Sequence, residues 1–162
     1  MVNFSRSTLQ GYLDQLSRKK PVPGGGSAAA LTAALGAGLV SMVANYSIGR
    51  KSNTAAVEKR LTKTLQASEA MRKRLLQLAT LDSKAYLKIV AARKSTPQAQ
   101  RKAGKEAAAV GKEACLLCYK ILDLIPFLVV KGNPYLISDL EAAAELLQAG
   151  FNASMVMVRI NQ

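Results

Sequence analysis

The sequence has no histidine and no tryptophan, and it has only two cysteines and ten acidic residues among 162. Histidine is the usual proton shuttle near neutral pH and the commonest metal ligand, so its absence removes both options. Any acid–base chemistry must therefore depend on aspartate, glutamate, lysine, tyrosine or water. A closed zinc site needs about four nitrogen or sulfur ligands, which two cysteines do not supply. We therefore expect no metal site.

The two cysteines give no disulfide framework, which favours a reducing compartment. The first residues lack the basic and apolar segments of a signal peptide, so we expect a cytoplasmic protein. Cys115 and Cys118 lie in an apolar helical run. Buried core thiols are the expected role for such a pair, and a redox function is the alternative.

Aromatic residues make up only 5% of the chain, whereas hydrophobic residues make up 49%. Alanine and leucine dominate, and this composition suits closely packed helices better than strands. The length predicts one domain, residues 1–162, that buries roughly two-thirds of its unfolded surface.

Apolar residues recur every three or four positions along most of the chain, and no alternating strand pattern is found. The sequence therefore predicts an all-α fold: a single helical bundle of five or more helices with a buried Ala/Gly-rich central helix. The expected helices span about 5–18 (capped by Ser5 or Ser7), 27–48, 54–93 (capped by Asn53 or Thr54), 97–122 (capped by Thr96), a short segment within 123–135, and 138–160.

The expected central helix belongs to an uncharged run between residues 21 and 49. It is long enough to span a membrane. Its residues are mostly Ala, Gly, Ser, Thr and Asn, however, and it has few of the Ile, Phe and Val typical of membrane spans. We therefore favour a buried core helix and expect no membrane insertion.

The formal net charge is +13, from 23 basic and 10 acidic residues. Such a surplus favours an anionic partner: nucleic acid, acidic lipid or a polyanionic small molecule. Nucleic-acid binding is possible but less favoured, because no interleaved aromatics or known reading motif accompany the charge. Solvated helix faces are the simpler explanation for the basic clusters, which are Lys59-Arg60-Lys63, Arg72-Lys73-Arg74 and Arg101-Lys102-Lys105.

A glycine-rich loop precedes the central helix. Prolines stiffen its approach, and three glycines allow another group to come close to the backbone. Ser27 is a favoured N-cap residue, and the free N–H groups of a helix start attract electron-rich ligand atoms. The sequence therefore predicts a ligand-binding loop made of Pro23, Gly24, Gly25, Gly26 and Ser27.

Two aspartates are candidate acid–base groups. Asp82 stands among apolar residues on a helical face, where a buried carboxylate must be paired, hydrogen-bonded or functional. The pattern alone also allows an exposed or ion-paired aspartate. Asp139 follows Ser138 in a capping-box pattern, and stabilisation of the helix dipole is a sufficient reason for both residues.

Several segments together resemble the cyclodeaminase/cyclohydrolase family, which includes the C-terminal domain of formiminotransferase-cyclodeaminase. The stretch Leu78, Asp82 and Tyr86 is similar to the family's Leu…Asp-x-x-Ala-aromatic pattern. Other matching segments are PVPGGGSAAAL (21–31), LVSMVAN (39–45), GRK (49–51), KGN (131–133), SDL (138–140) and RIN (159–161). Their order and spacing cover nearly the whole chain.

The resemblance implies an all-helical homodimer that acts on a tetrahydrofolate derivative without a further cofactor. Family members convert 5-formimidoyltetrahydrofolate to 5,10-methenyltetrahydrofolate with loss of ammonia, or interconvert the methenyl and 10-formyl forms. The implied catalytic residues are Asp82 and Asp139. The implied substrate-binding residues are Pro23, Gly24, Gly25, Gly26, Ser27, Lys51, Asn133, Ser138 and Asn161. In family members the helical pattern continues beyond the residues that match 159–161. This difference from the family and the high positive charge leave one alternative to the enzyme open. It is a catalytically inactive helical module of the same fold that binds folate or another anionic partner.

Overall fold

The computed structural model describes residues 7–162, and every regular element in that range is helical. The predicted all-α class is therefore confirmed. The elements are α1 (Leu9–Leu16), α2 (Gly25–Ser47), α3 (Ala55–Ala92), α4 (Pro97–Leu122), α5 (Ile125–Lys131), the 3-10 helix η2 (Pro134–Leu136) and α6 (Ile137–Ile160).

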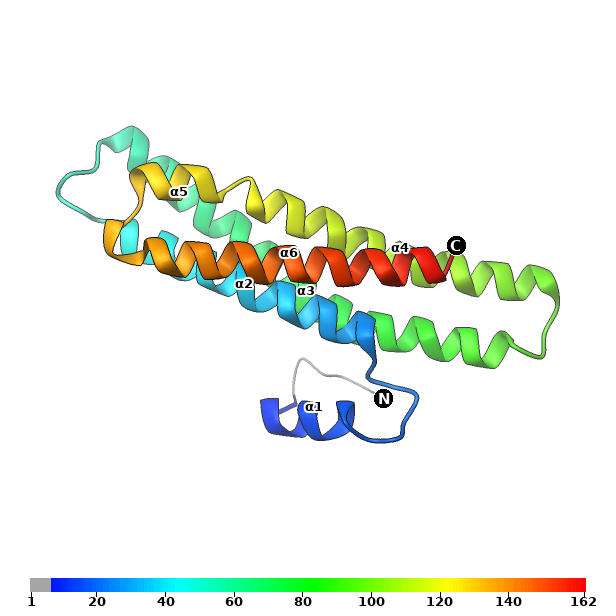
Figure 1. Cartoon of the computed structure of the whole chain (residues 1–162). Coiled ribbons are helices and arrows are strands. Elements are labelled where there is room, and N and C mark those ends of the chain that lie inside the picture. The colour runs from blue at the N-terminus through cyan, green and yellow to red at the C-terminus, as the bar shows by residue number, and fades with distance from the viewer. Residues whose placement is uncertain (1–6) are drawn as a thin grey trace.

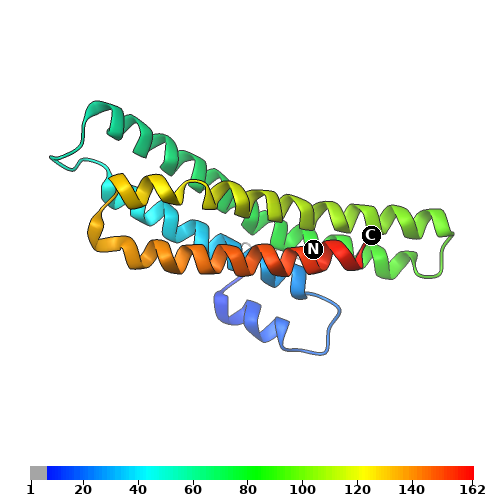
Figure 2. The ribbon, with the colours of Figure 1, turned by 45° about the horizontal axis from the view of Figure 1, so that its top comes forward.

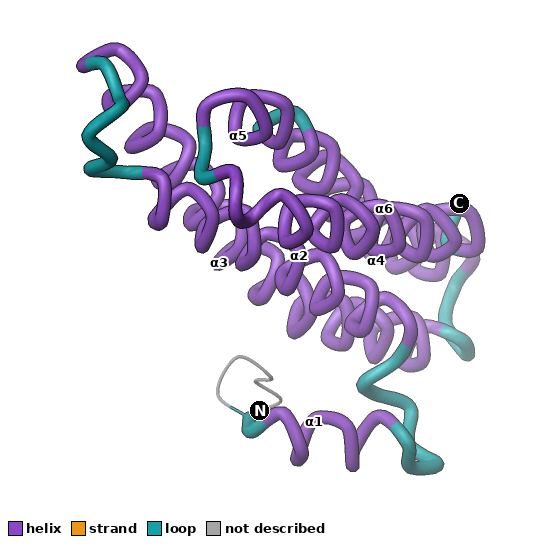
Figure 3. The backbone as a smooth tube through the Cα atoms, turned by 60° about the vertical axis from the view of Figure 1, so that its left-hand side comes forward, coloured by secondary structure: helices purple, strands orange, loops and turns teal. Residues whose placement is uncertain are grey.

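Four long helices form the bundle, and they run side by side along its length (Figures 1 and 2). Helix α2 packs against α3 and α6, and α4 packs against the same two helices. The turn between α3 and α4 projects beyond the end of α6, whereas α5 and the α2–α3 loop lie at the opposite end (Figure 1). Helix α1 stands outside the bundle, joined to it by the loop that leads into α2 (Figure 3).

Helix α2 supplies much of the core, as the sequence predicted. Ala33, Ala37, Val40, Val43 and Ala44 are all 0% exposed. By length and composition α2 could cross a membrane, but 61% of its most apolar window is buried inside the fold. Packing against α3 and α6 accounts for this apolar composition.

Glycines let α2 and α6 approach each other closely. A Cβ atom added to Gly150 would lie 2.8 Å from the Cβ of Ala33. One added to Gly36 would lie 2.9 Å from the carbonyl oxygen of Ala143. These distances are too short for real Cβ contacts, so the helix crossing depends on glycine at both positions.

Two of the predicted helix starts are confirmed. The Thr54 hydroxyl accepts a hydrogen bond from the Val57 N–H at 3.3 Å, and Thr96 caps α4 in the same way through Ala99. Pro97 occupies the first turn of α4, where its missing N–H costs nothing.

Three predicted caps are wrong. Helix α2 begins at Gly25 with Gly24 as its N-cap, so Ser27 lies inside the first turn. Helix α6 begins at Ile137, directly after η2, and Ser138 is therefore a helical residue and not a cap. Thr8, not Ser7, caps α1, and Ser5 lies outside the described residues. In the first two cases the preceding backbone already enters the helix, so the serine is not needed to start it.

The two cysteines are core thiols on α4, as predicted. Both are buried and neither forms a disulfide. Burial raises the pKa of Cys118 to about 12 and also raises the pKa of Cys115. Both thiols are therefore protonated at neutral pH, which removes the thiolate that redox chemistry needs.

Candidate active site

A cavity of about 280 Å³ lies where α2 begins and α6 ends. The loop before α2 forms one wall, and α3, α4 and α6 form the others. Most of its lining is apolar or glycine, with one carboxyl group, one phenol and one amide side chain. The lining residues are Pro21, Val22, Gly24, Gly25, Gly26, Asp82, Tyr86, Ile89, Ala107, Met157, Ile160 and Asn161.

Asp82 of α3 is the carboxyl group in this cavity. It is half-buried, so the exposed alternative for this residue is wrong. The backbone N–H of Ser27 donates a hydrogen bond to its carboxylate. Burial raises the pKa of Asp82 above its ordinary value, although that hydrogen bond acts in the opposite direction.

The N-terminus of α2 is closed by this carboxylate from another helix. Gly24, the N-cap residue, has no side chain to cap the free N–H groups. Asp82 takes over that role through Ser27. The glycine loop makes the approach possible, because a Cβ atom on Gly26 would overlap the Asp82 carboxylate. The sequence and the geometry therefore agree on why a glycine stands at position 26.

The end of α6 forms the opposite wall. A side chain on Gly25 would contact Met157, the Cβ position being 3.4 Å from its Cε atom. The Asn161 Nδ2 group donates to the Met157 carbonyl at 2.8 Å, which fixes the amide at the cavity edge. Tyr86 stands one helical turn after Asp82 on α3, so both side chains reach the same cavity.

The structure brings one group of the predicted site residues together at this end of the bundle. Asp82, Gly24, Gly25, Gly26 and Asn161 line the cavity. Of the remaining loop residues, Pro23 is buried and follows a cis peptide bond, and Ser27 meets Asp82 through its backbone.

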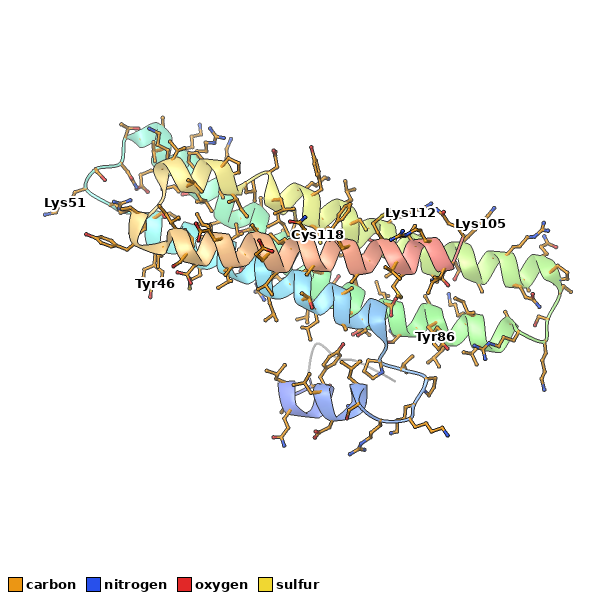
Figure 4. All side chains as sticks on the ribbon, viewed as in Figure 1. Tyr46, Lys51, Tyr86, Lys105, Lys112 and Cys118 are labelled. Carbon is orange, nitrogen blue, oxygen red and sulfur yellow. The ribbon has the colours of Figure 1, made fainter. Side chains whose placement is uncertain are left out.

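The other predicted residues lie at the opposite end of the same chain. Asp139 and Ser138 are in the first turn of α6, whereas the cavity lies beside its last turn. At 1.5 Å per residue the two positions are roughly 30 Å apart. Lys51 is exposed in the α2–α3 loop at that distant end, far from Tyr86 (Figure 4).

Asn133 belongs to a hydrogen-bonded cluster at that distant end. Its N–H donates to the Ser47 Oγ atom at 2.9 Å. Arg50 donates to the Gly132 carbonyl at 2.6 Å, and the Asn53 side chain donates to the Ser47 carbonyl at 2.8 Å. This cluster ties the α2–α3 loop to the segment before η2. Lys51, Asn133, Ser138 and Asp139 therefore form a second group, which we call the distal group.

Sequence reasoning missed several cavity residues. Tyr86 and Met157 could have been found by helical spacing, since each stands four positions from a predicted residue, Asp82 or Asn161. Ile89, two helical turns after Asp82 on α3, carried the same signal. Ala107 has no such signal, because only the packing of α4 beside α3 brings it to the cavity. Tyr12, which contacts Ser27 from outside the cavity, was also missed, because only the packing of α1 beside α2 brings the two together.

Comparison with known proteins places these features in context. The family model described as Formiminotransferase-cyclodeaminase matches residues 8–162. A methenyltetrahydrofolate cyclohydrolase from Methylorubrum extorquens is 34% identical, over 95% of this chain and 78% of that protein. The formimidoyltransferase-cyclodeaminase of Mus musculus is 29% identical, over 96% of this chain but only 30% of that protein. The crystal structure of formiminotetrahydrofolate cyclodeaminase from Thermotoga maritima superposes with a TM-score of 0.93 at 33% identity. That match covers 96% of this chain and 78% of the other.

Proposed function

Because this chain belongs to the formiminotransferase-cyclodeaminase family, we propose that it catalyses a one-carbon reaction of tetrahydrofolate, as a cyclodeaminase or a cyclohydrolase. The observation that carries the proposal is the half-buried Asp82 carboxyl, held at a helix N-terminus inside a mainly apolar cavity. The wide match to the cyclohydrolase and to the cyclodeaminase structure supports both forms of the reaction.

Both reactions need one group that takes and returns a proton. In cyclodeamination, N10 of the folate attacks the formimidoyl carbon, N10 loses a proton, and ammonia leaves after its nitrogen is protonated. In the cyclohydrolase direction, water adds to the methenyl carbon and loses a proton, and the bond from that carbon to N5 then breaks as N5 is protonated. The raised pKa of Asp82 brings its carboxyl closer to neutral pH, where a carboxyl can exchange a proton in either direction.

The cavity size supports one placement of the substrate. Ligand pockets measure roughly 300–1,000 Å³, and this one, at about 280 Å³, is at the small end. It therefore suits the reacting pterin end, with Ile89, Met157 and Ile160 keeping water away from the ring. The anionic glutamate end of the folate then lies outside, where the surplus of basic residues favours it.

We also propose that the protein is a homodimer. Leu35 and Tyr46 of α2 are 56% and 65% exposed, and the half-buried Leu39 and Met42 stand between them at helical spacing. Such an apolar stripe on an otherwise charged protein is typical of an interface. A two-fold axis perpendicular to α2 would make the two copies of this helix antiparallel. The distal group of one protomer would then lie near the cavity of its partner.

The proposed reaction uses the tetrahydrofolate derivative as substrate and requires no further cofactor, and this remains a prediction. Within residues 7–162, no three or more His, Cys, Asp or Glu side chains gather as metal ligands. A cytoplasmic location is proposed as well, and the free, buried cysteines support it.

The test is an assay of both reactions with the purified protein under reducing conditions. We expect ammonia release from 5-formimidoyltetrahydrofolate, hydrolysis of 5,10-methenyltetrahydrofolate, or both. Asp82→Asn should lower kcat by about 100-fold or more, because the carboxyl is the proton-transfer group. Asp123→Asn, at an exposed position at the end of α4, is the matched control and should leave kcat unchanged. Folate binding without turnover of either substrate by the wild type would contradict the proposal and favour the inactive module.

A further inference from the structure

Helix α1 is held to the bundle mainly by one side chain. Tyr12 is its only buried residue within the described part of the chain, at 4% exposed. Leu9 and Leu13 are 66% and 51% exposed, and Leu16 is half-buried. Loss of the Tyr12 contact would therefore loosen α1 together with the loop that follows it.

The Tyr12 contact leads directly to the cavity. Its hydroxyl lies 3.1 Å from the Oγ atom of Ser27, and Ser27 is fully buried. The N–H of the same serine donates to the Asp82 carboxylate. Ser27 thus links the two side chains. Its hydroxyl contacts the Tyr12 hydroxyl, and its backbone N–H donates to the Asp82 carboxylate. Burial, with a smaller contribution from the Asp82 charge, raises the pKa of Tyr12, so its phenol keeps its proton.

The loop between α1 and α2 is the element that this contact controls. Pro21, Val22 and Gly24 of that loop line the cavity beside Asp82. The loop is anchored at its far end by α2 and at its near end by α1, which depends on Tyr12. A loose α1 would therefore admit water to the wall that buries the carboxyl.

We propose that Tyr12 is a positioning residue for Asp82, which fixes α1 and the following loop through Ser27 and so keeps the carboxyl shielded from water. Its effect on turnover rests on the proposed function, whereas its effect on the carboxyl does not. Tyr12 is not among the residues that line the cavity. In this proposal it acts through Ser27 and the loop before α2.

Titration of the Asp82 carboxyl by carbon-13 NMR tests the proposal without any substrate. The chain has four aspartates, and the signal lost in Asp82→Asn identifies the one of interest. Burial holds the wild-type pKa above its ordinary value, so Tyr12→Phe should lower it as water enters. Asp82 and Tyr86 are the titratable groups that line the cavity among the described residues, and Tyr12 lies behind Ser27.

Leu13→Ala, on the exposed side of α1, is the control and should leave the Asp82 titration unchanged. Ser27→Ala removes the same hydrogen bond with a smaller change in volume, and it should lower the pKa of Asp82 as Tyr12→Phe does. An unchanged titration in either variant, with a folded circular dichroism spectrum, would overturn the proposal. If Tyr12→Phe does not fold, the Asp82 titration in Ser27→Ala tests the proposal instead.

Activity gives the second measurement. Tyr12→Phe should lower kcat by about tenfold, the usual size for a group that orients a catalytic one, and shift the acidic limb of the pH profile to lower pH. Leu13→Ala should change neither. A wild type that turns over neither folate would refute the proposed function but not the positioning role of Tyr12, because the Asp82 titration tests that role without substrate. A normal pH profile in Tyr12→Phe, from an active wild type, would refute the positioning role.

Discussion

The position of Asp82 disfavours the charged carboxylate relative to the unfolded chain. Burial raises its pKa relative to the unfolded chain, and the Ser27 N–H only partly offsets this. A group with a raised native pKa contributes stability below its unfolded pKa, and that contribution is lost as the pH rises through the native value. At neutral pH the ionised Asp82 is therefore a cost to the fold, of the kind that active sites commonly carry.

Asp82→Asn should for this reason raise the melting temperature at pH 7 by a few degrees, while kcat falls. The asparagine side chain keeps an oxygen to accept from Ser27 and carries no charge to bury. Towards pH 3, well below the ordinary aspartate pKa of about 3.9, the wild-type carboxyl is protonated in both states, and the difference in melting temperature should vanish. Thermal unfolding of both proteins from pH 3 to pH 8 measures this, and a variant that is less stable at every pH would contradict it.

At the residue scale the sequence predicted Asp82 and the glycine loop but misread Ser27. The apolar neighbours of Asp82 indicated burial, and the glycines indicated a close approach of another group. Ser27 was taken for the N-cap because a hydroxyl at a helix start usually fills that role. The actual cap, a carboxylate from α3, is a tertiary contact between positions 55 residues apart in the chain, and no local pattern encodes it.

At the element scale, a helix start is predictable where a capping residue or a proline in the local sequence sets it without help from a neighbouring element. Thr54, Thr96 and Pro97 set the starts of α3 and α4 as predicted. The start of α6 was wrong because η2, a turn of different hydrogen bonding, runs directly into it. The crossing of α2 and α6 was predictable only in part. An Ala/Gly-rich helix is compatible with close packing, but the residues of α6 that Gly36 meets came from the structure alone.

The two glycines Gly36 and Gly38 of α2 provide a matched test of that crossing. A Cβ atom at position 36 would lie 2.9 Å from both the Ala143 carbonyl oxygen and the Leu147 Cγ atom. At position 38 the nearest contact is the flexible Arg72 side chain at 3.7 Å. Gly36→Ala should lower the free energy of unfolding by about 1–3 kcal/mol, the usual cost of overpacking.

Gly38→Ala should raise the free energy of unfolding by up to about 1 kcal/mol, because alanine is the better helix former and has room there. Urea unfolding followed by circular dichroism measures both values. Equal effects of the same sign at the two positions would show that helix propensity and not the α2–α6 contact governs this stretch.

At the scale of the whole molecule, the predicted site residues fall into two groups at opposite ends of the bundle. The sequence predicted them as one site, because segments in linear order carry no record of which end of a helix they reach. Asp139 and Asn161 stand at the two ends of the same helix, α6, which a helical reading of residues 138–160 already implied. One active site can use both groups only if two chains meet with opposite directions.

Mixing two inactive variants tests whether the site is shared. If each active site combines Asp82 of one protomer with the distal group of its partner, Asp82→Asn and Asp139→Asn should each be inactive alone. A heterodimer of the two would contain one site with both substitutions and one native site. Random reassociation gives about half heterodimers, so the mixture should recover about a quarter of the wild-type activity.

Co-refolding of the two variants, with the dimer verified by analytical ultracentrifugation, provides the measurement. Each variant refolded alone is the control and should stay inactive. Recovery in the mixture requires both an interface between copies and a native site assembled across it, because the two substitutions otherwise lie in separate chains that stay inactive. Full activity of Asp139→Asn alone would instead limit the chemistry to the Asp82 cavity. Asp139 in the first turn of α6 would then have a structural role only. A negative charge at a helix start is stabilised by the helix dipole.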